Sequence, residues 1–141
     1  MRRVLVDTNI FLDLALDRQP HSQHARNVWR AVESGHIEGY VTTVSLVNIH
    51  YIAQKTLGIE VARRFIGDIM ETFLLAEITE KGVREALSLL FQDFEDAVQH
   101  FSAVESCCDA IVTRDLSGFT PSAIPIFQPD TFVEKLFAGG F

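Results

Sequence analysis

The side chains best suited to chemistry in this 141-residue sequence are aspartates placed just after short apolar runs. Asp7 comes directly after the apolar residues 4–6, and Asp115 follows the apolar residues 110–112 after two intervening residues. Such runs are too short for helices and are typical of buried strands. Parallel strands present their carboxyl ends at one edge of a sheet, which is where ligands bind. We therefore expect Asp7 and Asp115 to share that edge.

Asp96 would join them if its helix begins at the same edge. It lies in the first turn of a helix that we expect to start at Asp93. Three clustered carboxylates are costly without a cation, because two like charges ~4 Å apart repel by about 4 kcal/mol at an effective dielectric constant of ~20. Oxygen ligands with no thiolate or histidine cluster favour Mg²⁺ or Mn²⁺, which also bridge to phosphate oxygens. The pattern indicates metal-assisted attack of water on a phosphodiester.

Each acid also has an ordinary structural interpretation. Asp7 and Asp93 could cap helices, and Asp96 could simply be a favourable acid in a first helical turn. Asp115 could cap a short turn. Taken singly, these interpretations are at least as good as the catalytic one. The shared edge favours a common site, because capping does not require acids from different strands to meet.

Apolar runs alternate with stretches of helical periodicity along the chain. The predicted strands lie near residues 4–6, 39–42, 73–78, 109–113 and 124–127. Prolines flank the last of these segments, which favours a sheet edge for it. Strands separated by helices predict an α/β fold, a three-layer α/β/α sandwich with a central parallel sheet of four to five strands.

Helical spacing also predicts which apolar side chains are buried. Ala86 and Leu87 should face inward on the helix that Thr79 caps, and Phe94 should face inward on the following helix. Trp29 has the spacing of a core or dimer-surface residue rather than that of a platform for base stacking.

Length and composition fit one domain over residues 1–138, with residues 139–141 as a frayed tail. No run approaches the ~20 apolar residues of a membrane helix. Asp7 comes too early for a secretory signal, so we expect a cytoplasmic protein. The two cysteines are adjacent, which is neither a disulfide framework nor a zinc spacing. A formal charge of −7 opposes binding to phosphate backbones unless cations, a basic patch or a basic partner offset it.

Three short motifs resemble the PIN-domain family over nearly the whole chain. They are Val-Asp-Thr-Asn at residues 6–9, Asp-Phe-Glu-Asp-Ala at residues 93–97, and Ile-Val-Thr-Arg-Asp at residues 111–115 with Phe119 following. The resemblance implies an α/β/α sandwich and an endoribonuclease that depends on Mg²⁺ or Mn²⁺. It also implies the toxin of a toxin–antitoxin pair, with RNA as substrate, a homodimeric state and a small antitoxin protein as partner.

The resemblance further implies roles for individual residues. Asp7 and Asp96 would be the principal catalytic metal ligands, and Asp115 would be a further acid of the site. Thr113 would be a supporting hydroxyl, and Asn9 would hydrogen-bond to the loop of Asp7. An antitoxin tail that enters the acidic groove would explain part of the negative charge.

This sequence departs from the family pattern at two places. Asn48 stands where many members have a glutamate, and its uncharged amide makes a second metal site doubtful. Gly118 stands where an acid is frequent. Asp93 and Glu95 are near enough in sequence to compensate, although we expect Glu95 to face away from the site.

Two basic side chains, Arg114 and His50, have both a functional and a structural interpretation. Arg114 could contact phosphate, but an ordinary surface ion pair is the somewhat better interpretation. His50 lies on the same predicted helix as Asn48, where a structural role is more common than general-base catalysis.

Two other functions remain open. Aspartyl-nucleophile phosphatases also place an aspartate after the first strand, but they typically carry a second acid where this chain has Asn9. A catalytically weak or silent PIN fold that binds RNA or protein is the second alternative, and Asn48 and Gly118 keep it open.

Overall fold

The computed structural model describes residues 1–89, 93–119 and 122–139. Of the tail that was predicted to fray, residues 140 and 141 lie outside the described residues. The strands are β1 (Arg3–Val6), β2 (Glu38–Thr42), β3 (Leu74–Ala76), β4 (Ala110–Val112) and β5 (Ile126–Phe127). The helices are α1 (Thr8–Ala15), α2 (His21–Glu33), α3 (Thr43–Leu57), α4 (Ile59–Thr72), α5 (Glu80–Ser88), α6 (Phe94–Glu105) and α7 (Pro129–Phe137), with a 3-10 turn η1 (Ser117–Phe119).

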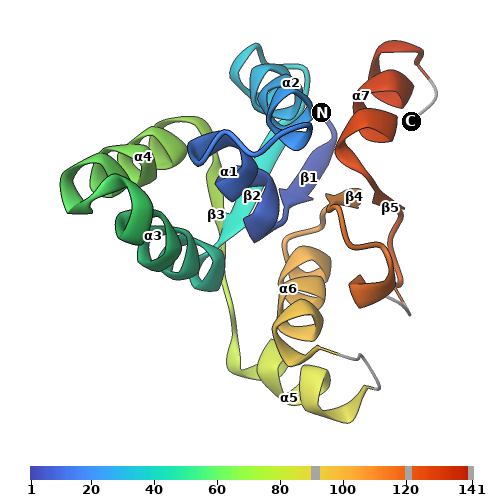
Figure 1. Ribbon diagram of the computed structural model, residues 1–141. Coiled ribbons are helices and arrows are strands. Elements are labelled where there is room, and N and C mark those ends of the chain that lie inside the picture. Colours follow the sequence, from blue (N-terminus) through green and yellow to red (C-terminus); the bar gives the residue numbers. More distant parts are fainter. Residues whose placement is uncertain (90–92, 120–121, 140–141) are drawn as a thin grey trace.

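The five strands form one parallel sheet in the order β3-β2-β1-β4-β5 (Figure 1). β1 lies at the centre, and its register pairs Leu5 with Tyr40 of β2 and with Ile111 of β4. β5 forms one edge, as its flanking prolines predict. The α/β class and the parallel sheet of four to five strands are therefore confirmed.

Alternation along β1 divides the core between the two faces of the sheet. Val4 and Val6 belong to a cluster that includes residues of α1, α2, α3, α4 and α7. Leu5 points to the opposite face, where it packs with Ala103 of α6 and Phe119 of η1. Successive side chains of a strand point to opposite faces, so a fully apolar strand must be covered on both sides. The result is the predicted three-layer arrangement.

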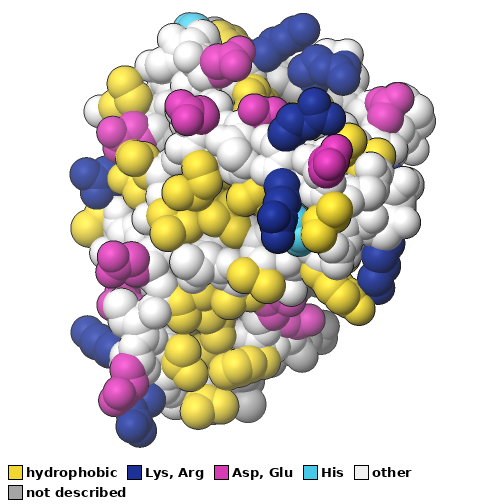
Figure 2. All heavy atoms as spheres, turned by 90° about the vertical axis from the view of Figure 1, so that its left-hand side faces the viewer, with side chains coloured by type: hydrophobic (Ala, Val, Ile, Leu, Met, Phe, Trp, Pro, Cys, Tyr) yellow, Lys and Arg dark blue, Asp and Glu magenta, His cyan; other side chains and the backbone are white. Residues whose placement is uncertain are grey.

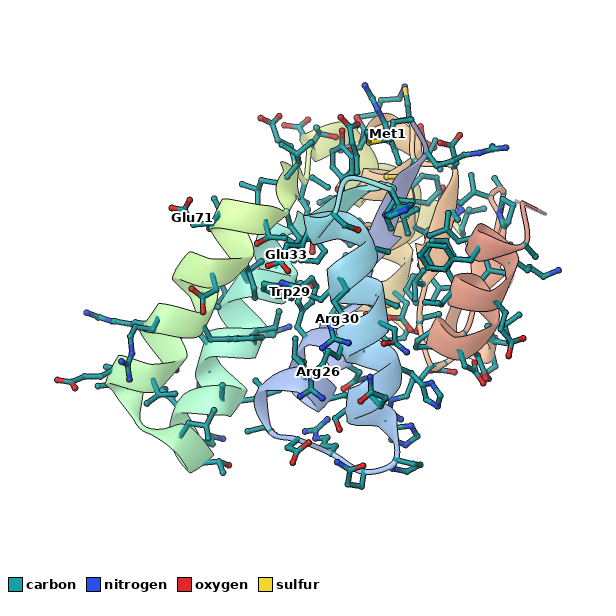
Figure 3. All side chains as sticks on the ribbon, turned by 90° about the horizontal axis from the view of Figure 1, so that it is seen from above. Met1, Arg26, Trp29, Arg30, Glu33 and Glu71 are labelled. Carbon is teal, nitrogen blue, oxygen red and sulfur yellow. The ribbon has the colours of Figure 1, made fainter. Side chains whose placement is uncertain are left out.

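Trp29 belongs to the core on the side of the sheet that carries α2. Figure 3 shows it pointing from α2 toward the α3–α4 hairpin. Its ring stacks on Phe65 with centroids 6.0 Å apart, and it makes an edge contact with Phe73 at 5.0 Å. These contacts leave its ring unavailable as a platform for bases.

The burial predicted for two apolar side chains is wrong. Leu87 of α5 is 71% exposed and Phe94 of α6 is 51% exposed. Ala86 and Ala97 occupy the buried stripe between the two helices instead. Helical periodicity predicts an apolar stripe on each helix, but the packing of α5 on α6 determines how much of that stripe is buried. None of the helices in the described part of the chain combines the length and apolar character needed to span a bilayer.

Candidate active site

Asp7 is a buried carboxylate at the carboxyl end of the central strand. Its backbone N–H donates to the Val112 carbonyl at 3.0 Å, which extends the β1–β4 ladder by one residue. Its Oδ1 accepts from the Thr8 N–H at 2.8 Å and from the Gln99 amide at 3.0 Å, and its Oδ2 accepts from the Thr113 hydroxyl at 2.8 Å. Burial raises the pKa of Asp7, while these three donors oppose that shift. The side chain is held in one orientation.

Thr113 joins Asp7 to the loop that carries Asp115. Its hydroxyl donates to Asp7 and accepts from the Asp115 N–H at 3.0 Å. Asp115 is exposed, and its Oδ1 accepts from the Ser117 hydroxyl at 2.9 Å and from the Gly118 N–H at 3.1 Å. One buried hydroxyl therefore fixes the spacing between two of the predicted site aspartates.

Asp96 comes to the same edge from α6. Asp93 caps this helix by accepting from the Asp96 N–H at 3.2 Å, which starts the helix with Asp96 in its first turn. Partial burial, together with the negative charges of Asp7, Asp93 and Asp115, raises the pKa of Asp96 to about 7. The structure thus brings all three predicted aspartates into electrostatic contact.

Gly118 explains how the carboxylates can approach one another. A Cβ atom added at this position would overlap Asp96 Oδ2 and would lie only 2.7 Å from Asp115 Oδ2. Gly118 therefore lies against both side chains, and a larger residue would have to displace them. The space that a side chain at position 118 would occupy is thus taken up by the carboxylates of Asp96 and Asp115.

Gln99 is a site residue that sequence reasoning missed. It is fully buried and links Asp7 to the start of α3, because its Oε1 accepts from the Ser45 hydroxyl at 3.1 Å and from the Thr42 hydroxyl at 3.4 Å. Thr8 shares a 2.6 Å hydrogen bond with Ser45. A polar residue in the apolar stripe of a helix, three positions after Asp96, was the available signal.

Asn48 and Glu95 form a second polar pair beside the aspartates. The Asn48 amide donates to Glu95 Oε1 at 3.1 Å. Burial raises the pKa of Glu95, and the negative charge of Asp7 contributes. The prediction that Glu95 faces away from the site is therefore wrong. A first-turn helical position allows a long side chain to reach back over the helix start, which sequence periodicity does not reveal.

Arg114 is engaged with a buried acid rather than with an exposed one. Its Nε and Nη2 donate to Asp13 at 2.6 and 3.0 Å, and Arg18 lies 3.6 Å from the same carboxylate. Asp13 is fully buried on α1. A bidentate pair of this kind has a fixed geometry. It holds the segment between Thr113 and Asp115 against α1, which sequence reasoning did not foresee.

Within the described residues, no hydrogen bond joins Asn9 or His50 to the carboxylates of the aspartates. Asn9 is exposed on α1, and the donors to the Asp7 carboxylate there are Thr8, Gln99 and Thr113, so a hydrogen bond from Asn9 to the loop of Asp7 stays a prediction. His50 lines a hollow between α3 and α4 together with Arg63.

The carboxylates have the chemistry of a site for a hard cation. Asp7 uses three of its roughly four acceptor positions. Asp115 Oδ2 and both Asp96 oxygens accept no hydrogen bond from the described residues. As placed, no group of three or more acidic, histidine or cysteine side chains in the described ranges is arranged to hold a metal ion. Mg²⁺ needs few protein carboxylates and keeps several waters, so the free oxygens of this open cluster could serve as ligands without a preformed protein cage.

The chain is similar to known proteins over most of its length. A family model for the PIN domain matches residues 3–117. Ribonuclease VapC1 from Aquifex aeolicus is 23% identical over 141 residues, covering 94% of this chain and 94% of that protein.

Solved structures agree with the family match at the level of the fold. DNA-bound VapBC from Salmonella typhimurium gives a TM-score of 0.71 at 17% identity, covering 92% of this chain and 99% of that chain. A toxin–antitoxin complex from Klebsiella pneumoniae gives a TM-score of 0.65 at 21% identity, covering 89% of this chain and 97% of that chain. The family model and the topology lead to one conclusion: this chain belongs to the PIN-domain family.

Proposed function

We propose that this protein is an endoribonuclease that hydrolyses RNA phosphodiester bonds with Mg²⁺ or Mn²⁺, within a single domain over residues 1–138. The observation that carries the proposal is the approach of the Asp96 and Asp115 carboxylates to the same position at Gly118, with the charge of the buried Asp7 close enough to act on both. Without a cation this arrangement leaves Asp96 with a pKa of about 7. The relative from Aquifex aeolicus, which is a ribonuclease, supports the same reaction.

The three aspartates would hold the ion and are the proposed catalytic residues. A bound Mg²⁺ or Mn²⁺ would activate the attacking water and stabilise charge on the phosphate. Gln99 and Thr113 orient Asp7 by donating to both of its oxygens, and these hydrogen bonds oppose the rise of its pKa that burial causes. Asp93 sets the position of Asp96 through the helix cap.

Glu95 offers a further acid where Asn48 replaces the usual glutamate. Its side chain reaches the site from α6 and is oriented by the Asn48 amide. We assign it a supporting role in binding a second cation, with lower affinity than the site of the three aspartates. Glu95 thus supplies, from α6, the carboxyl group that Asn48 lacks. This arrangement favours an active ribonuclease over a catalytically silent PIN fold.

We further propose that the protein is the toxin of a toxin–antitoxin pair, forms a homodimer and acts in the cytoplasm. The Klebsiella pneumoniae structure, which is a toxin–antitoxin complex, supports such a partner. Figure 2 shows hydrophobic side chains gathered on the face that carries α3 and α4 and extending below it. Val47 and Tyr51 of α3 are 68% and 55% exposed. An apolar surface of this kind fits contact with another protein.

The test is RNA cleavage by the purified protein freed of any antitoxin. We expect cleavage with Mn²⁺ or Mg²⁺, loss of cleavage in excess chelator, and loss of cleavage in Asp96→Asn. Asp68→Asn is the matched control, since Asp68 is exposed on α4 and should leave activity unchanged. Cleavage that persists in chelator or in Asp96→Asn would overturn the metal mechanism. No cleavage by wild type under any of these conditions would identify a silent fold.

A further inference from the structure

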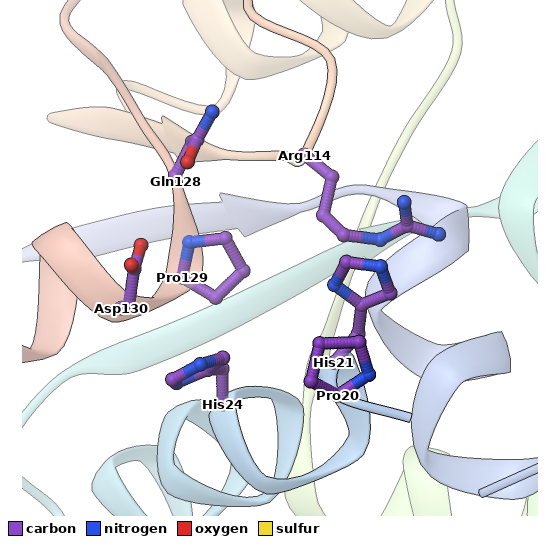
Figure 4. Close-up of a pocket in the computed structure, with 7 residues that line it drawn as sticks. All are labelled: Pro20, His21, His24, Arg114, Gln128, Pro129 and Asp130. Atoms are coloured by element: carbon purple, nitrogen blue, oxygen red, sulfur yellow. The ribbon is translucent and has the colours of Figure 1, made fainter. Parts of the chain in front are cut away.

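A pocket of about 280 Å³ lies beside Arg114 and has no role in the site described above. It opens between the first turn of α2 and the first turn of α7 (Figure 4). Arg114 and His21 border it from one side, and Pro129 and Asp130 border it from the other, with His24 between the two helices.

The pocket contains several hydrogen-bond donors without partners. His21 and His24 are one helical turn apart and half-buried, and within the described residues neither imidazole makes a hydrogen bond. An imidazole can donate an N–H in either protonation state. Arg114 has five N–H donors, of which two are used by Asp13. Its guanidinium is fixed in place by that pair and keeps donors for a ligand.

Two helix N-termini add to the positive character of this pocket. α2 has no acidic residue in its first turn and no side-chain cap, although its Ser22 N–H donates to the Arg18 carbonyl at 2.7 Å. α7 begins at the same pocket with Pro129. Two carboxylates oppose this character: Asp13, which pairs with Arg114, and Asp130, which is exposed and whose Oδ1 accepts from the Thr131 N–H at 2.8 Å. The combination of an arginine, two imidazoles and two helix N-termini suits an anion with several oxygens.

The pocket adjoins the acidic site through the backbone. Arg114 lies between Thr113 and Asp115, and Cα atoms of consecutive residues are about 3.8 Å apart. A polyanion with its reacting group at Asp115 would therefore lie one residue along the chain from Arg114, which lines the pocket. In a protein with a formal charge of −7, this is a local site at which a negative ligand meets donors instead of carboxylates.

We infer that this pocket binds a phosphate group of the RNA backbone next to the bond that is cut, with His21, His24 and Arg114 as the donors. The inference rests on the proposed ribonuclease function. It implies that His21, His24 and Arg114 determine the affinity for RNA and which phosphodiester of the RNA lies at the aspartates, while the aspartates perform the reaction.

The first experiment tests phosphate binding without turnover. Histidine signals of the whole protein are followed by NMR during titration with inorganic phosphate in the presence of chelator. We expect saturable shifts for His21 and His24, and none for His36, which is exposed after the other end of α2 and is the control. Equal shifts for all three, or none, would overturn the site, whether or not the protein cuts RNA.

The second experiment tests whether the phosphate belongs to RNA. His21→Ala and His24→Ala should each raise KM for a short RNA about tenfold or more and leave kcat within about twofold, because a hydrogen bond to a charged group is lost. His36→Ala should change neither. Asp130→Asn should lower KM, since it removes an opposing charge. An unchanged KM in both histidine variants would overturn the assignment to RNA, even if inorganic phosphate binds.

The third experiment uses a series of RNA substrates, each with one phosphodiester replaced by a neutral methylphosphonate, to find which phosphate of the RNA binds in the pocket. We expect one position near the cleaved bond at which the neutral linkage raises KM for wild type about tenfold but has no further effect on His24→Ala. Equal effects on both proteins at every position would contradict a direct contact. If wild type cuts no RNA with either metal, the proposed function fails, and the phosphate titration alone decides whether the pocket is an anion site.

Discussion

Replacing Asp96 by asparagine should stabilise the metal-free protein at neutral pH. The pKa of Asp96 is raised from 3.8 to about 7 in the fold, so the native state holds this proton more tightly than the unfolded chain does. Ionisation therefore opposes folding: the penalty is absent below pH 3.8, grows as the pH rises toward 7 and is constant above it. A pKa change of this size corresponds to about 4 kcal/mol. Because Asp96 is only partly buried, solvent screening reduces the penalty, and we expect about 2 kcal/mol.

Urea unfolding in chelator measures this effect. At pH 8, Asp96→Asn should have a free energy of unfolding about 2 kcal/mol higher than that of wild type, and at pH 4 the difference should nearly vanish. Saturating Mn²⁺ should reverse the order at pH 8, because it stabilises only the protein that binds it. A variant that is no more stable at pH 8, or equally more stable at both pH values, would refute the clustered-charge reasoning.

Three further substitutions test the supports of the site. Gln99→Leu should lower the free energy of unfolding by about 2 kcal/mol in urea, because it removes the amide between Asp7 and α3, and an unchanged value would contradict that link. Arg114→Met should lower the free energy of unfolding by about 3 kcal/mol in the same assay, because the buried carboxylate of Asp13 loses its bidentate partner. An unchanged free energy of unfolding would mean that Arg18 alone is enough to stabilise the Asp13 carboxylate. Gly118→Ala should slow RNA cleavage about fivefold to a hundredfold, an estimate from about 1–3 kcal/mol of overpacking, while Gly67→Ala, with open space around it, should not. Equal rates in the two glycine variants would refute the steric role.

The fold follows from the sequence because its strands are buried on both faces. Residues 4–6 and 110–112 are continuous apolar runs, and such runs indicate parallel strands covered by helices. The edge rule then places acids that follow these strands together. Both inferences depend on local patterns, which a sequence displays directly.

Long-range contacts account for what the sequence did not reveal. Gln99 reaches Asp7 across 92 positions, and Arg114 reaches Asp13 across 101 positions. No local pattern pairs such residues. Their only signal was a polar side chain within an apolar stripe, which is ambiguous until the neighbouring element is known. The exposure of Leu87 and Phe94 also depends on long-range packing. Helical periodicity places both side chains on an apolar face, but it does not show how much of that face a neighbouring helix covers.

Titration with Mn²⁺ in a cleavage assay shows whether a metal ion held by the three aspartates is required for RNA cleavage. Bound Mn²⁺ and the initial rate of RNA cleavage would be measured on the same antitoxin-free samples at pH 8, for wild type and for Asp96→Asn. The wild-type rate should rise in proportion to bound Mn²⁺, and Asp96→Asn should lose high-affinity binding and cleavage together. A wild-type rate that is independent of bound Mn²⁺, or cleavage by Asp96→Asn at the wild-type rate, would contradict this requirement.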